Sequence, residues 1–476
     1  MSARYLTTTL PYVNSDPHIG FAQEIVQADV LARSYRAAGD DVFFSTGTDE
    51  HGQKLHDAAE KAGKSPQAYV DTYAAEFRNL KEALDLSNDA FIRTTDAAHI
   101  QAAQEMWRRC AAKGDIYKKT YTGLYCVGCE LFKTEKELVD GKCSLHPNLT
   151  PQEVSEENYF FRFSNYQERL LAYLERLTSI VPEWRREEAI NFAKSGLEDF
   201  SISREAARLS WGIPVPGDET QVMYVWFDAL TNYISTLGWP ADAEGNFKKF
   251  WEAGQTLQVA GKDQIRFQSL MWQAMLLSAD IKNTDQVFYH GFITSGGQKM
   301  SKSLGNVINP FDLVRTYGTD AVRYILLRHL SPVEDSDLTL EAIRDHYTAN
   351  LTNGLGNLVA RVMKLAEEHL SEPVALVPLE EFTTFKFLVD TFKFNEAMDA
   401  VFQMISHADE RMNATAPFKK IKDPTTADEA RADIRDLVQE LGKIAAELQW
   451  AMPATSEKIL AAIRENRKPE NLFPRL

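Results

Sequence analysis

The feature that most constrains the fold is an alternation of strand-like and helix-like runs that stops near Gly114 and resumes after Gln221. Such an alternation is typical of a parallel sheet with helices on its faces. The sequence therefore predicts one α/β domain with a doubly wound sheet, split into two halves by an insertion. The runs are Tyr5–Leu10, Ala22–Ala38, "DVFFSTGTDEHG", a helix around Ala58, Tyr73–Leu84, "VMYVWFDAL", "LQVAGKD", Ile265–Ser278 and "VFYHGFI".

The chain from Leu340 onward follows a different pattern. Apolar residues recur there at i, i+3 and i+4 in "LTNGLGNLVARVMKLAEEHL" and "FKFNEAMDAVFQMISHADERMN", which indicates amphipathic helices. We expect five parts along the chain: the first half of the α/β domain, the insertion, the second half, a connecting segment and an all-α domain. Their expected ranges are 1–114, 115–220, 221–298, 299–340 and 341–476.

Composition excludes several classes of protein. A chain of 476 residues with a net charge of −16 is not a general nucleic-acid binder, because such proteins are normally basic overall. Even the apolar run "SLMWQAMLLSA" ends at Asp280, short of the ~18 residues that a membrane span needs. The first predicted strand begins close to Met1, which leaves no room for a signal or transit peptide. We therefore expect a cytoplasmic protein without membrane spans.

A histidine stands between a proline and a glycine where the first predicted strand is followed by a helix. Pro17 fixes the backbone at the helix entry, and Gly20 lets a ligand approach the backbone closely. The first turn of a helix offers unpaired N–H groups and the positive end of the helix dipole, which suits a phosphate. Taken alone, however, a histidine such as His18 is more often a capping or solvated residue.

A second segment strengthens the phosphate interpretation. The run "GGQKMSKSLGN" spans Gly296–Asn306 and carries Lys299 and Lys302 after paired glycines, between a predicted strand and a helix that opens at Pro310. Lysine ammonium groups act as movable point charges on phosphates, and the glycines allow the loop to close. A charged loop by itself is usually only solvated. Together with Pro17–Gly20 in one α/β frame, it predicts a triphosphate site.

The cysteines indicate a metal rather than disulfides. Four cysteines in so long a chain cannot form a disulfide framework. Cys126 and Cys129 form a CxxC pair, and Cys143 with His146 forms a CxxH pair after a charged spacer. Such pairs bring four ligands to one tetrahedral zinc and leave no position for water. We predict one structural zinc; the alternative is a group of unpaired, reduced thiols.

The run "GTDEHGQK" has nearly the glycine spacing of a phosphate-binding P-loop. Gln53 takes the place of the lysine, and Asp49 and Glu50 would bring negative charge beside the phosphates. A P-loop is therefore rejected.

Several motifs in order identify a family. The segments "TTLPYVNSDPHIG", "TGTDEHGQK", "YVWFDALTNY", "GKDQIRFQ", "KMSKSLGN" and "NGLGNLVARV" resemble those of class I aminoacyl-tRNA synthetases, and specifically the methionyl-tRNA synthetase family, along nearly the whole chain. The resemblance implies a Rossmann-type catalytic domain, a zinc knuckle at about 121–150, a mobile lysine loop and an anticodon-binding helical bundle. It also implies ATP-dependent activation of methionine, with Mg²⁺, and transfer to the 3′ end of tRNA(Met).

The resemblance also implies residue roles. The expected catalytic groups are His18, Lys299 and Lys302, which stabilise the phosphates and the leaving pyrophosphate. Further ATP contacts are expected at Gly20, Phe21, Gly261, Asp263, Met300 and Ser301. The amino acid is expected to contact Leu10, Tyr12, Glu24, Asp49, Trp226, Ala229, Tyr233, Gln264 and Gln268, with Asp49 binding the α-ammonium group and Asp228 shaping the same wall. The anticodon is expected at Asn357, Arg361 and Phe418, beside the positive charge of Lys419, Lys420 and Lys422.

Three residues depart from the family pattern. Phe21 replaces the second histidine of the HIGH signature, Gln268 stands where a histidine is frequent, and Gln264, four residues earlier on the same expected helix face, replaces a commonly apolar residue. The alternatives are therefore a class I synthetase for another aliphatic amino acid or for cysteine, and a catalytically degenerate tRNA-binding paralogue. The insertion looks too small for the editing domain that accurate leucine, isoleucine or valine enzymes carry. We expect a monomer.

Overall fold

The computed structural model describes residues 2–128, 131–133, 138–144, 146–300, 306–377 and 384–476. The chain divides into two compact units, each assembled from several stretches of sequence. The sheet unit comprises Met1–Pro17, Asp40–Asn79 and Asn88–Tyr289. The helical unit comprises His18–Gly39, Leu80–Ser87 and His290–Leu476.

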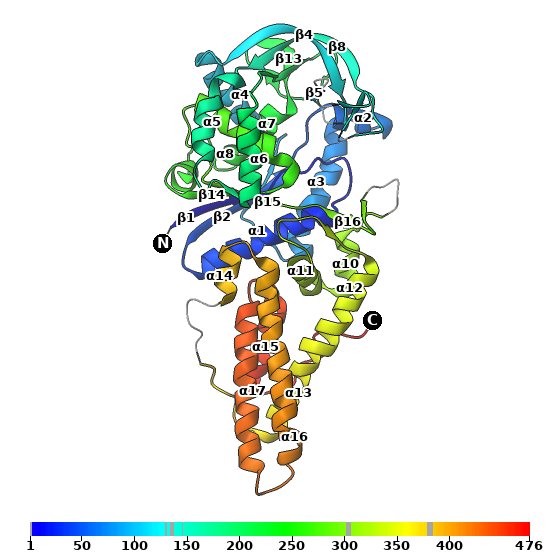
Figure 1. The fold of residues 1–476 in the computed structure, drawn as a ribbon, viewed down its shortest axis with the longest axis vertical. Coiled ribbons are helices and arrows are strands. Elements are labelled where there is room, and N and C mark those ends of the chain that lie inside the picture. Colours follow the sequence, from blue (N-terminus) through cyan, green and yellow to red (C-terminus); the bar gives the residue numbers. More distant parts are fainter. Residues whose placement is uncertain (1, 129–130, 134–137, 145, 301–305, 378–383) are drawn as a thin grey trace. The chain divides into compact units, whose positions relative to one another are not determined.

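The sheet unit contains a six-stranded sheet with the order β3–β2–β1–β14–β15–β9. Strands β1, β2, β14 and β15 of this sheet are labelled in Figure 1. The ladders β1–β2, β1–β14, β2–β3 and β9–β15 are parallel. Residues in β1, β2 and β14 are buried in near-continuous runs, as expected for strands covered on both faces. The predicted α/β fold is confirmed. The strands are β1 (Ala3–Thr7), β2 (Asp41–Thr48), β3 (Ala90–Arg93), β9 (Ile180–Val181), β14 (Gln255–Gly261) and β15 (Gln286–His290).

The helices associated with these strands pack an aromatic-rich core that contains Trp107, Phe227 and Trp272. The predicted single helix over Ile265–Ser278 is instead a π-helical segment, Ile265–Met271, followed by an α-helix. The helices are α2 (Gln53–Lys61), α3 (Pro66–Ala83), α4 (Ala97–Ala112), α5 (Gln167–Leu174), α6 (Glu183–Lys194), α7 (Val225–Leu230), α8 (Asn232–Ser235) and α9 (Trp272–Ser278).

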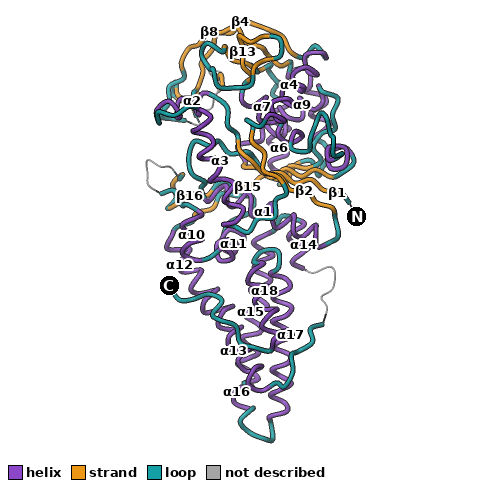
Figure 2. The backbone as a smooth tube through the Cα atoms, turned by 180° about the vertical axis from the view of Figure 1, so that it is seen from behind, coloured by secondary structure: helices purple, strands orange, loops and turns teal. Residues whose placement is uncertain are grey.

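The interruption of the alternation is an antiparallel β region. Its two longest strands, β4 and β8, run side by side in both views (Figures 1 and 2) and pair from Ile116↔Phe161 to Tyr125↔Gln152. One sheet has the order β10–β8–β4–β5, another β11–β13–β12, and β6 and β7 form a hairpin. The strands are β4 (Ile116–Cys126), β5 (Leu131–Lys133), β6 (Leu138–Val139), β7 (Lys142–Cys143), β8 (Gln152–Phe161), β10 (Phe200–Ser201), β11 (Ser203–Glu205), β12 (Pro214–Val215) and β13 (Asp218–Met223).

The helical unit contains the predicted C-terminal helices. Within it α15 packs against α17, and α17 against α13 and α18 (Figure 2). Helix α17 buries an apolar stripe that includes Ile434, Leu437, Val438 and Leu441. The helices are α1 (Ile19–Ala37), α10 (Pro310–Tyr317), α11 (Thr319–Arg328), α12 (Leu340–His346), α13 (Asn357–His369), α14 (Thr384–Asp390), α15 (Phe394–Thr415), α16 (Pro417–Lys420), α17 (Ala427–Leu448) and α18 (Pro453–Glu465).

A buried ion pair fixes three parts of this unit. Asp29 of α1 and Arg323 of α11 are fully buried and approach to 2.8 Å. Arg323 also donates to the main-chain oxygens of Leu84, Trp450 and Ala451. Burial alone would raise the pKa of Asp29, but the Arg323 guanidinium and Arg33 together lower it. One guanidinium therefore holds α1, α11 and the turn that follows α17 together.

Candidate active site

His18 is the N-cap of α1, and its ring is oriented by the helix itself. The Gly20 amide donates to His18 Nδ1 at 3.1 Å. Because Nδ1 accepts, the proton of the neutral ring lies on Nε2, which makes Nε2 a hydrogen-bond donor. Although the residue is exposed overall, desolvation by the protein around the ring lowers its pKa, and the Glu24 charge opposes this shift. The structure therefore presents a neutral imidazole that donates from Nε2.

Gly20 is constrained by this arrangement. A Cβ atom at Gly20 would lie 3.0 Å from His18 Cε1 and 3.1 Å from Nδ1, closer than ordinary contacts. Any larger residue would therefore displace the ring. Phe21, the next residue, is buried.

The ends of the lysine loop are held within the helical unit. Strand β16 (Ile293–Ser295) pairs with β17 (Gln298–Lys299) and with β18 (Ser336–Asp337), and the turn between β16 and β17 uses Gly296 and Gly297 at positive φ. Asp337 accepts from the Gly297 amide at 2.7 Å. After the loop, the main-chain oxygen of Ile308 accepts from the Ile19 amide at 3.0 Å. The backbone that leaves the loop thus meets the helix start at His18.

Part of the predicted ATP site on the lysine loop lies outside the residues that the structure describes. Met300 is half-buried. Ser301 and Lys302 lie outside the described residues, as does the side chain of Lys299. Their predicted contacts with ATP remain predictions.

Glu24 has a defined partner within the helical unit. Its Oε2 lies 2.8 Å from His290 Nε2, and His290 Nδ1 bonds to the main-chain oxygen of Gly291 at 2.8 Å. Both side chains are buried. The predicted contact of Glu24 with the amino acid remains a prediction.

Aromatic residues of the predicted amino-acid site contact one another in the sheet unit. Trp226 of α7 stacks on Phe267 with ring centroids 3.7 Å apart, and Tyr12 meets Trp226 edge-on at 6.4 Å. Phe267 was missed by the sequence reasoning, although it lies inside the quoted motif "GKDQIRFQ". Leu10 is half-buried and Ala229 is buried, and their predicted contacts with the amino acid remain predictions.

The backbone of Asp49 pairs with the backbone at Tyr12. The two residues form an isolated parallel bridge, in which the Asp49 amide donates to Pro11 O at 3.0 Å. Asp49 is only 2% exposed. A carboxylate and an aromatic wall are therefore brought together from segments far apart in sequence.

Two glutamines occupy different local structures. Gln268 is buried in the π-helical segment and donates from Nε2 to the Tyr233 hydroxyl. Gln264 ends a single 3₁₀ turn, Lys262–Gln264, is half-buried and donates to Asp263 at 3.3 Å. The four-residue spacing between them is therefore not one α-helical turn, contrary to the sequence expectation of a shared helix face.

The nucleotide segment lies at the carboxyl end of a central strand. Gly261 is the last residue of β14, and the exposed Asp263 follows within the 3₁₀ turn. Ligands of parallel sheets bind at this edge. The predicted ribose contact of Asp263 remains a prediction.

The residues after Asp49 are engaged with the scaffold. Glu50 is fully buried and accepts four hydrogen bonds, from Thr48, from two nitrogens of Arg93 and from Thr95. His51 Nδ1 bonds to Asp228 at 2.7 Å, and His99 Nε2 bonds to the other oxygen of Asp228 at 2.8 Å. The sequence analysis did not identify Glu50, His51 and His99 as residues whose hydrogen bonds hold the segment after Asp49.

Three of the four predicted metal ligands converge. One ligand atom from each of Cys126, Cys143 and His146 lies within 4.8 Å of the others. Cys126 ends β4, Cys143 ends β7, and both thiols are buried. A Cβ at Gly128 would lie 2.7 Å from the His146 ring, so the chain passes close to the group. Cys129 lies outside the described residues.

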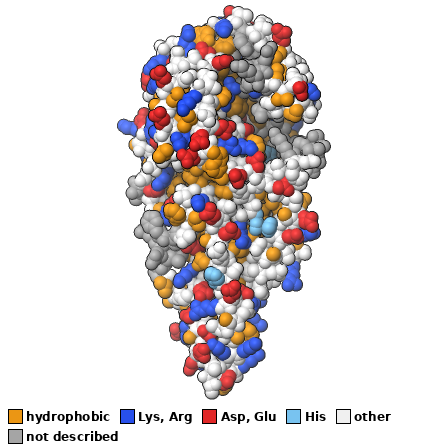
Figure 3. All heavy atoms as spheres, in the orientation of Figure 1, with side chains coloured by type: hydrophobic (Ala, Val, Ile, Leu, Met, Phe, Trp, Pro, Cys, Tyr) orange, Lys and Arg blue, Asp and Glu red, His pale blue; other side chains and the backbone are white. Residues whose placement is uncertain are grey.

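The predicted anticodon residues lie on neighbouring helices. Asn357 and Arg361 are in the first turns of α13, and Arg361 donates to Asp409 at 2.7 Å and to Asn413 at 3.0 Å, near the end of α15. Phe418 of α16, 36% exposed, follows five residues after Asn413. Lys420 is paired with Glu429 and Asp433. On the visible face of this end, basic and acidic side chains are mixed (Figure 3).

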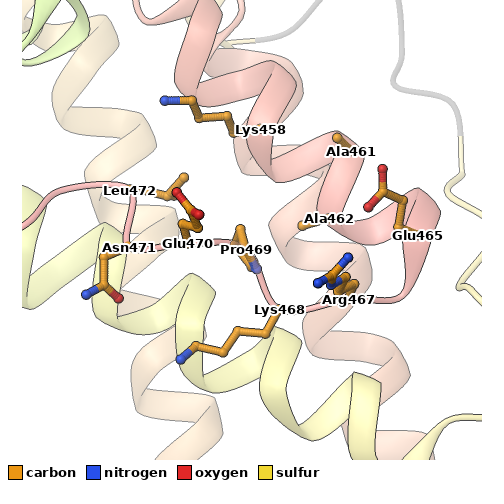
Figure 4. Close-up of a pocket in the computed structure, with 10 residues that line it drawn as sticks. All are labelled: Lys458, Ala461, Ala462, Glu465, Arg467, Lys468, Pro469, Glu470, Asn471 and Leu472. Carbon is orange, nitrogen blue, oxygen red and sulfur yellow. The ribbon is translucent and has the colours of Figure 1, made fainter.

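A cavity of about 430 Å³ lies elsewhere in the helical unit, between α18 and the C-terminal tail (Figure 4). Charged residues of both signs, including Lys458, Arg467 and Glu470, line it. None of the predicted site residues does. Among the described helices, none is long and apolar enough to cross a membrane.

Comparisons with known proteins agree with the sequence motifs. A family model described as tRNA synthetases class I (M) matches residues 4–149 and 135–363. A methionine–tRNA ligase of Rhizobium meliloti is 40% identical, over 96% of this chain and 90% of the relative. One from Thermotoga maritima is 38% identical, over 98% of this chain and 76% of the relative.

Solved structures show the same fold. The Mycobacterium tuberculosis methionyl-tRNA synthetase in complex with methionyl-adenylate is 38% identical, with a TM-score of 0.89 over 97% of this chain and 93% of that chain. The apo form of the same organism's enzyme is 33% identical, with a TM-score of 0.82 over 100% of this chain and 98% of that chain.

Proposed function

The chain belongs to the methionine–tRNA ligase family of class I tRNA synthetases, and from this membership we propose which residues perform the two steps of that reaction. In the first step, L-methionine and ATP form methionyl-adenylate and pyrophosphate. In the second, the methionyl group passes to the 3′ end of tRNA(Met). Class I chemistry of this kind needs positioning and positive charge rather than a covalent nucleophile.

His18 is proposed to donate from Nε2 to the phosphates, while Lys299 and Lys302 stabilise the pyrophosphate as it leaves. The methionine carboxylate attacks the α-phosphorus, and the bond to the bridging oxygen of pyrophosphate breaks. The observation that carries this assignment is the bond from the Ile19 amide to Ile308 O, which joins the helix start to the end of the lysine loop. Gly20, Phe21, Met300 and Ser301 complete the proposed contacts with Mg²⁺-ATP.

The amino acid is proposed to lie against the wall of Tyr12, Trp226 and Phe267, with its α-ammonium group on Asp49. Sulfur–aromatic contacts favour a thioether there, at ~0.3–1.5 kcal/mol each. Gln268, held by Tyr233, supplies a polar amide beside that wall. Leu10, Ala229, Glu24 and Gln264 are the further proposed contacts, and Gly261 and Asp263 are proposed to bind the adenosine.

A capping-neutral variant tests the role of His18. In His18→Asn the shorter amide can still accept from the Gly20 amide, since asparagine is a favoured N-cap, but it cannot reach the position of Nε2. We expect exchange of pyrophosphate into ATP to fall about 10²–10³-fold in kcat, as for loss of one preorganised donor. Gly20→Ala, which keeps His18 but displaces its ring, is expected to lower the rate as well. Unchanged rates in both variants would refute the assignment.

The choice of amino acid is tested by the unmodified chain. Pyrophosphate exchange is measured with methionine, leucine, isoleucine, valine and cysteine in turn. We expect exchange with methionine at the lowest concentration. Exchange with another amino acid would reassign the pocket, and exchange with none would favour a tRNA-binding paralogue.

A structural zinc is proposed at Cys126, Cys129, Cys143 and His146. Two buried thiols and an imidazole within 4.8 Å of one another are a donor set that suits zinc, and a closed site of this type stabilises a small loop-rich module. Zinc content is expected near one per chain and to fall in Cys126→Ser, with a lower melting temperature. Cys110→Ser, a buried cysteine in α4, is the control that keeps the metal. Equal metal content in both variants would contradict the site.

The helical unit is proposed to read the anticodon through Asn357, Arg361 and Phe418. A half-exposed ring can stack on an unpaired base, at ~1–3 kcal/mol. Phe418→Ala is expected to raise the KM for tRNA about tenfold or more without changing pyrophosphate exchange, while an equal KM would remove Phe418 from the interface. The protein is further proposed to act as a monomer in the cytoplasm, which size-exclusion chromatography with light scattering and cell fractionation test.

A further inference from the structure

The family motif around Asp49 contains two residues that the proposed reaction leaves without a role. Glu50 and His51 directly follow Asp49, and both are buried. Their side chains bond to different parts of the sheet unit, Glu50 to Arg93 of β3 and His51 to Asp228 of α7. The turn that carries Asp49 is therefore fixed on two sides.

Asp228 is the centre of the second fixation. It is fully buried, and each of its oxygens meets one imidazole: His51 Nδ1 at 2.7 Å and His99 Nε2 at 2.8 Å. The other nitrogen of His99, Nδ1, lies 2.8 Å from the Ser235 hydroxyl. A carboxylate only accepts, so both rings donate to it.

This chain of bonds joins the elements that form the amino-acid wall. Asp228 lies between Trp226 and Ala229 on α7, Ser235 lies two residues after Tyr233 on α8, and His51 lies two residues after Asp49. His99, from α4, bridges the two helices. Asp49, the proposed ammonium-binding carboxylate, and the aromatic wall come from distant parts of the sequence. The hydrogen bonds through Asp228, His51 and His99 set the distance between them.

We propose that Asp228, His51 and His99 are positioning residues that fix the Asp49 turn relative to the Trp226 wall and thereby set the affinity and selectivity for methionine. The proposal rests on the proposed function, because it concerns how the same pocket holds its substrate. Misplacement of a binding group by about 1 Å is enough to cost up to ~100-fold in rate. The three residues do not touch the phosphates in this account, so their loss should affect methionine and spare ATP.

Matched pairs of variants separate positioning from bulk stability. In His99→Gln the side-chain amide nitrogen can take the place of Nε2 and still donate to Asp228, whereas His99→Leu removes that donor. In His51→Asn the amide nitrogen takes the place of Nδ1, whereas His51→Leu removes it. The expected result is that the KM for methionine in pyrophosphate exchange rises about tenfold or more in the leucine variants, stays within about threefold in the amide variants, and that the KM for ATP is unchanged in all four.

Asp115→Asn is the control for loss of a buried carboxylate. Asp115 is also in the sheet unit, is 6% exposed and accepts from Tyr166 and Ser278, but it has no bond to the Asp49 turn or to α7. We expect a lower melting temperature with an unchanged KM for methionine. If His99→Leu does not fold, the His51 pair gives the same comparison.

The outcomes distinguish this inference from the proposed function. If the unmodified chain shows no exchange with methionine, the proposed function fails. If the unmodified chain is active but the leucine variants raise the KM for methionine and ATP alike, or change neither, the positioning role is refuted. Equal effects of the amide and leucine variants would also refute it.

Discussion

Asp29 in the helical unit and Asp228 in the sheet unit are both fully buried, yet they meet different partners. Asp29 faces the permanently charged guanidinium of Arg323, which also donates to the main-chain oxygens of Leu84, Asp85, Trp450 and Ala451. Asp228 faces two imidazoles that each give one directional bond. The permanent charge of Arg323 suits a rigid contact between helices. The two imidazoles, which come from separate elements, suit the proposed alignment of the Asp49 turn with the Trp226 wall.

The largest effect should come from breaking the first pair. Arg323→Met removes the buried partner of Asp29 and leaves it only Arg33, a partly exposed side chain 2.8 Å away, so we expect a loss of about 3–5 kcal/mol in the free energy of unfolding. Urea denaturation followed by circular dichroism measures this loss. A loss below about 1 kcal/mol would show that water or another cation compensates Asp29.

Asp228→Asn should destabilise less. The amide keeps one acceptor oxygen, so only one imidazole loses its partner, and an unsatisfied buried donor costs about 1–3 kcal/mol. The same denaturation experiment gives the value. A loss as large as that of Arg323→Met would mean that Asp228 is also a joint of the scaffold, and the comparison between the two carboxylates would fail.

Acid should remove the contribution of Asp29. Burial is the largest single influence on the pKa of Asp29 and raises it, but Arg323, Arg33 and the hydrogen bonds from Ser87 together lower the pKa in the folded chain. The stabilising effect of Asp29 is therefore complete above its ordinary pKa of about 3.9 and is lost as the pH falls below it. The stability difference between the wild type and Asp29→Asn should therefore shrink below about pH 4. A difference that stays constant down to pH 3 would contradict the pairing.

The stability of Asp29→Asn must be compared with that of the wild type at each pH, because a histidine also titrates in this acidic range. Burial, with the stacked His346 as a smaller cause, lowers the pKa of His329 to about 3. Because the pKa of this histidine is lower in the folded chain than in the unfolded chain, the free energy of unfolding decreases as the pH falls below about 6.5. That loss is common to the wild type and Asp29→Asn, so it cancels in their difference.

The smallest effect should come from a pair at the surface. Arg315 and Asp312 of α10 form an ion pair with side chains 71% and 63% exposed. Arg315→Met is expected to change the free energy of unfolding by no more than about 0.5 kcal/mol. A larger loss would show that exposure does not separate the weak pairs from the strong ones in this chain.

Short motifs were predictable where the interacting residues are close in sequence. Pro17–Gly20 predicted a helix start, although α1 begins at Ile19 rather than Ala22 because His18 itself acts as the cap. The spacing of Cys126, Cys143 and His146 predicted a convergent group, and the structure brings their ligand atoms within 4.8 Å. The alternation of runs likewise predicted the parallel sheet.

Long-range polar contacts were not predictable from the sequence. Asp228 lies 177 residues from His51 and 129 from His99, and no local pattern links them. The π-helical geometry of Ile265–Met271 was missed because its apolar pattern also fits an α-helix. Partner identity inside a core depends on tertiary packing, which a single sequence leaves open.

The most direct test compares Asp228→Asn with Asp29→Asn in pyrophosphate exchange. We predict that Asp228→Asn raises the KM for methionine about tenfold relative to that for ATP, and that Asp29→Asn leaves the ratio of the two constants unchanged. The same shift of that ratio in both variants, or in neither, would contradict the division of roles between the two buried carboxylates.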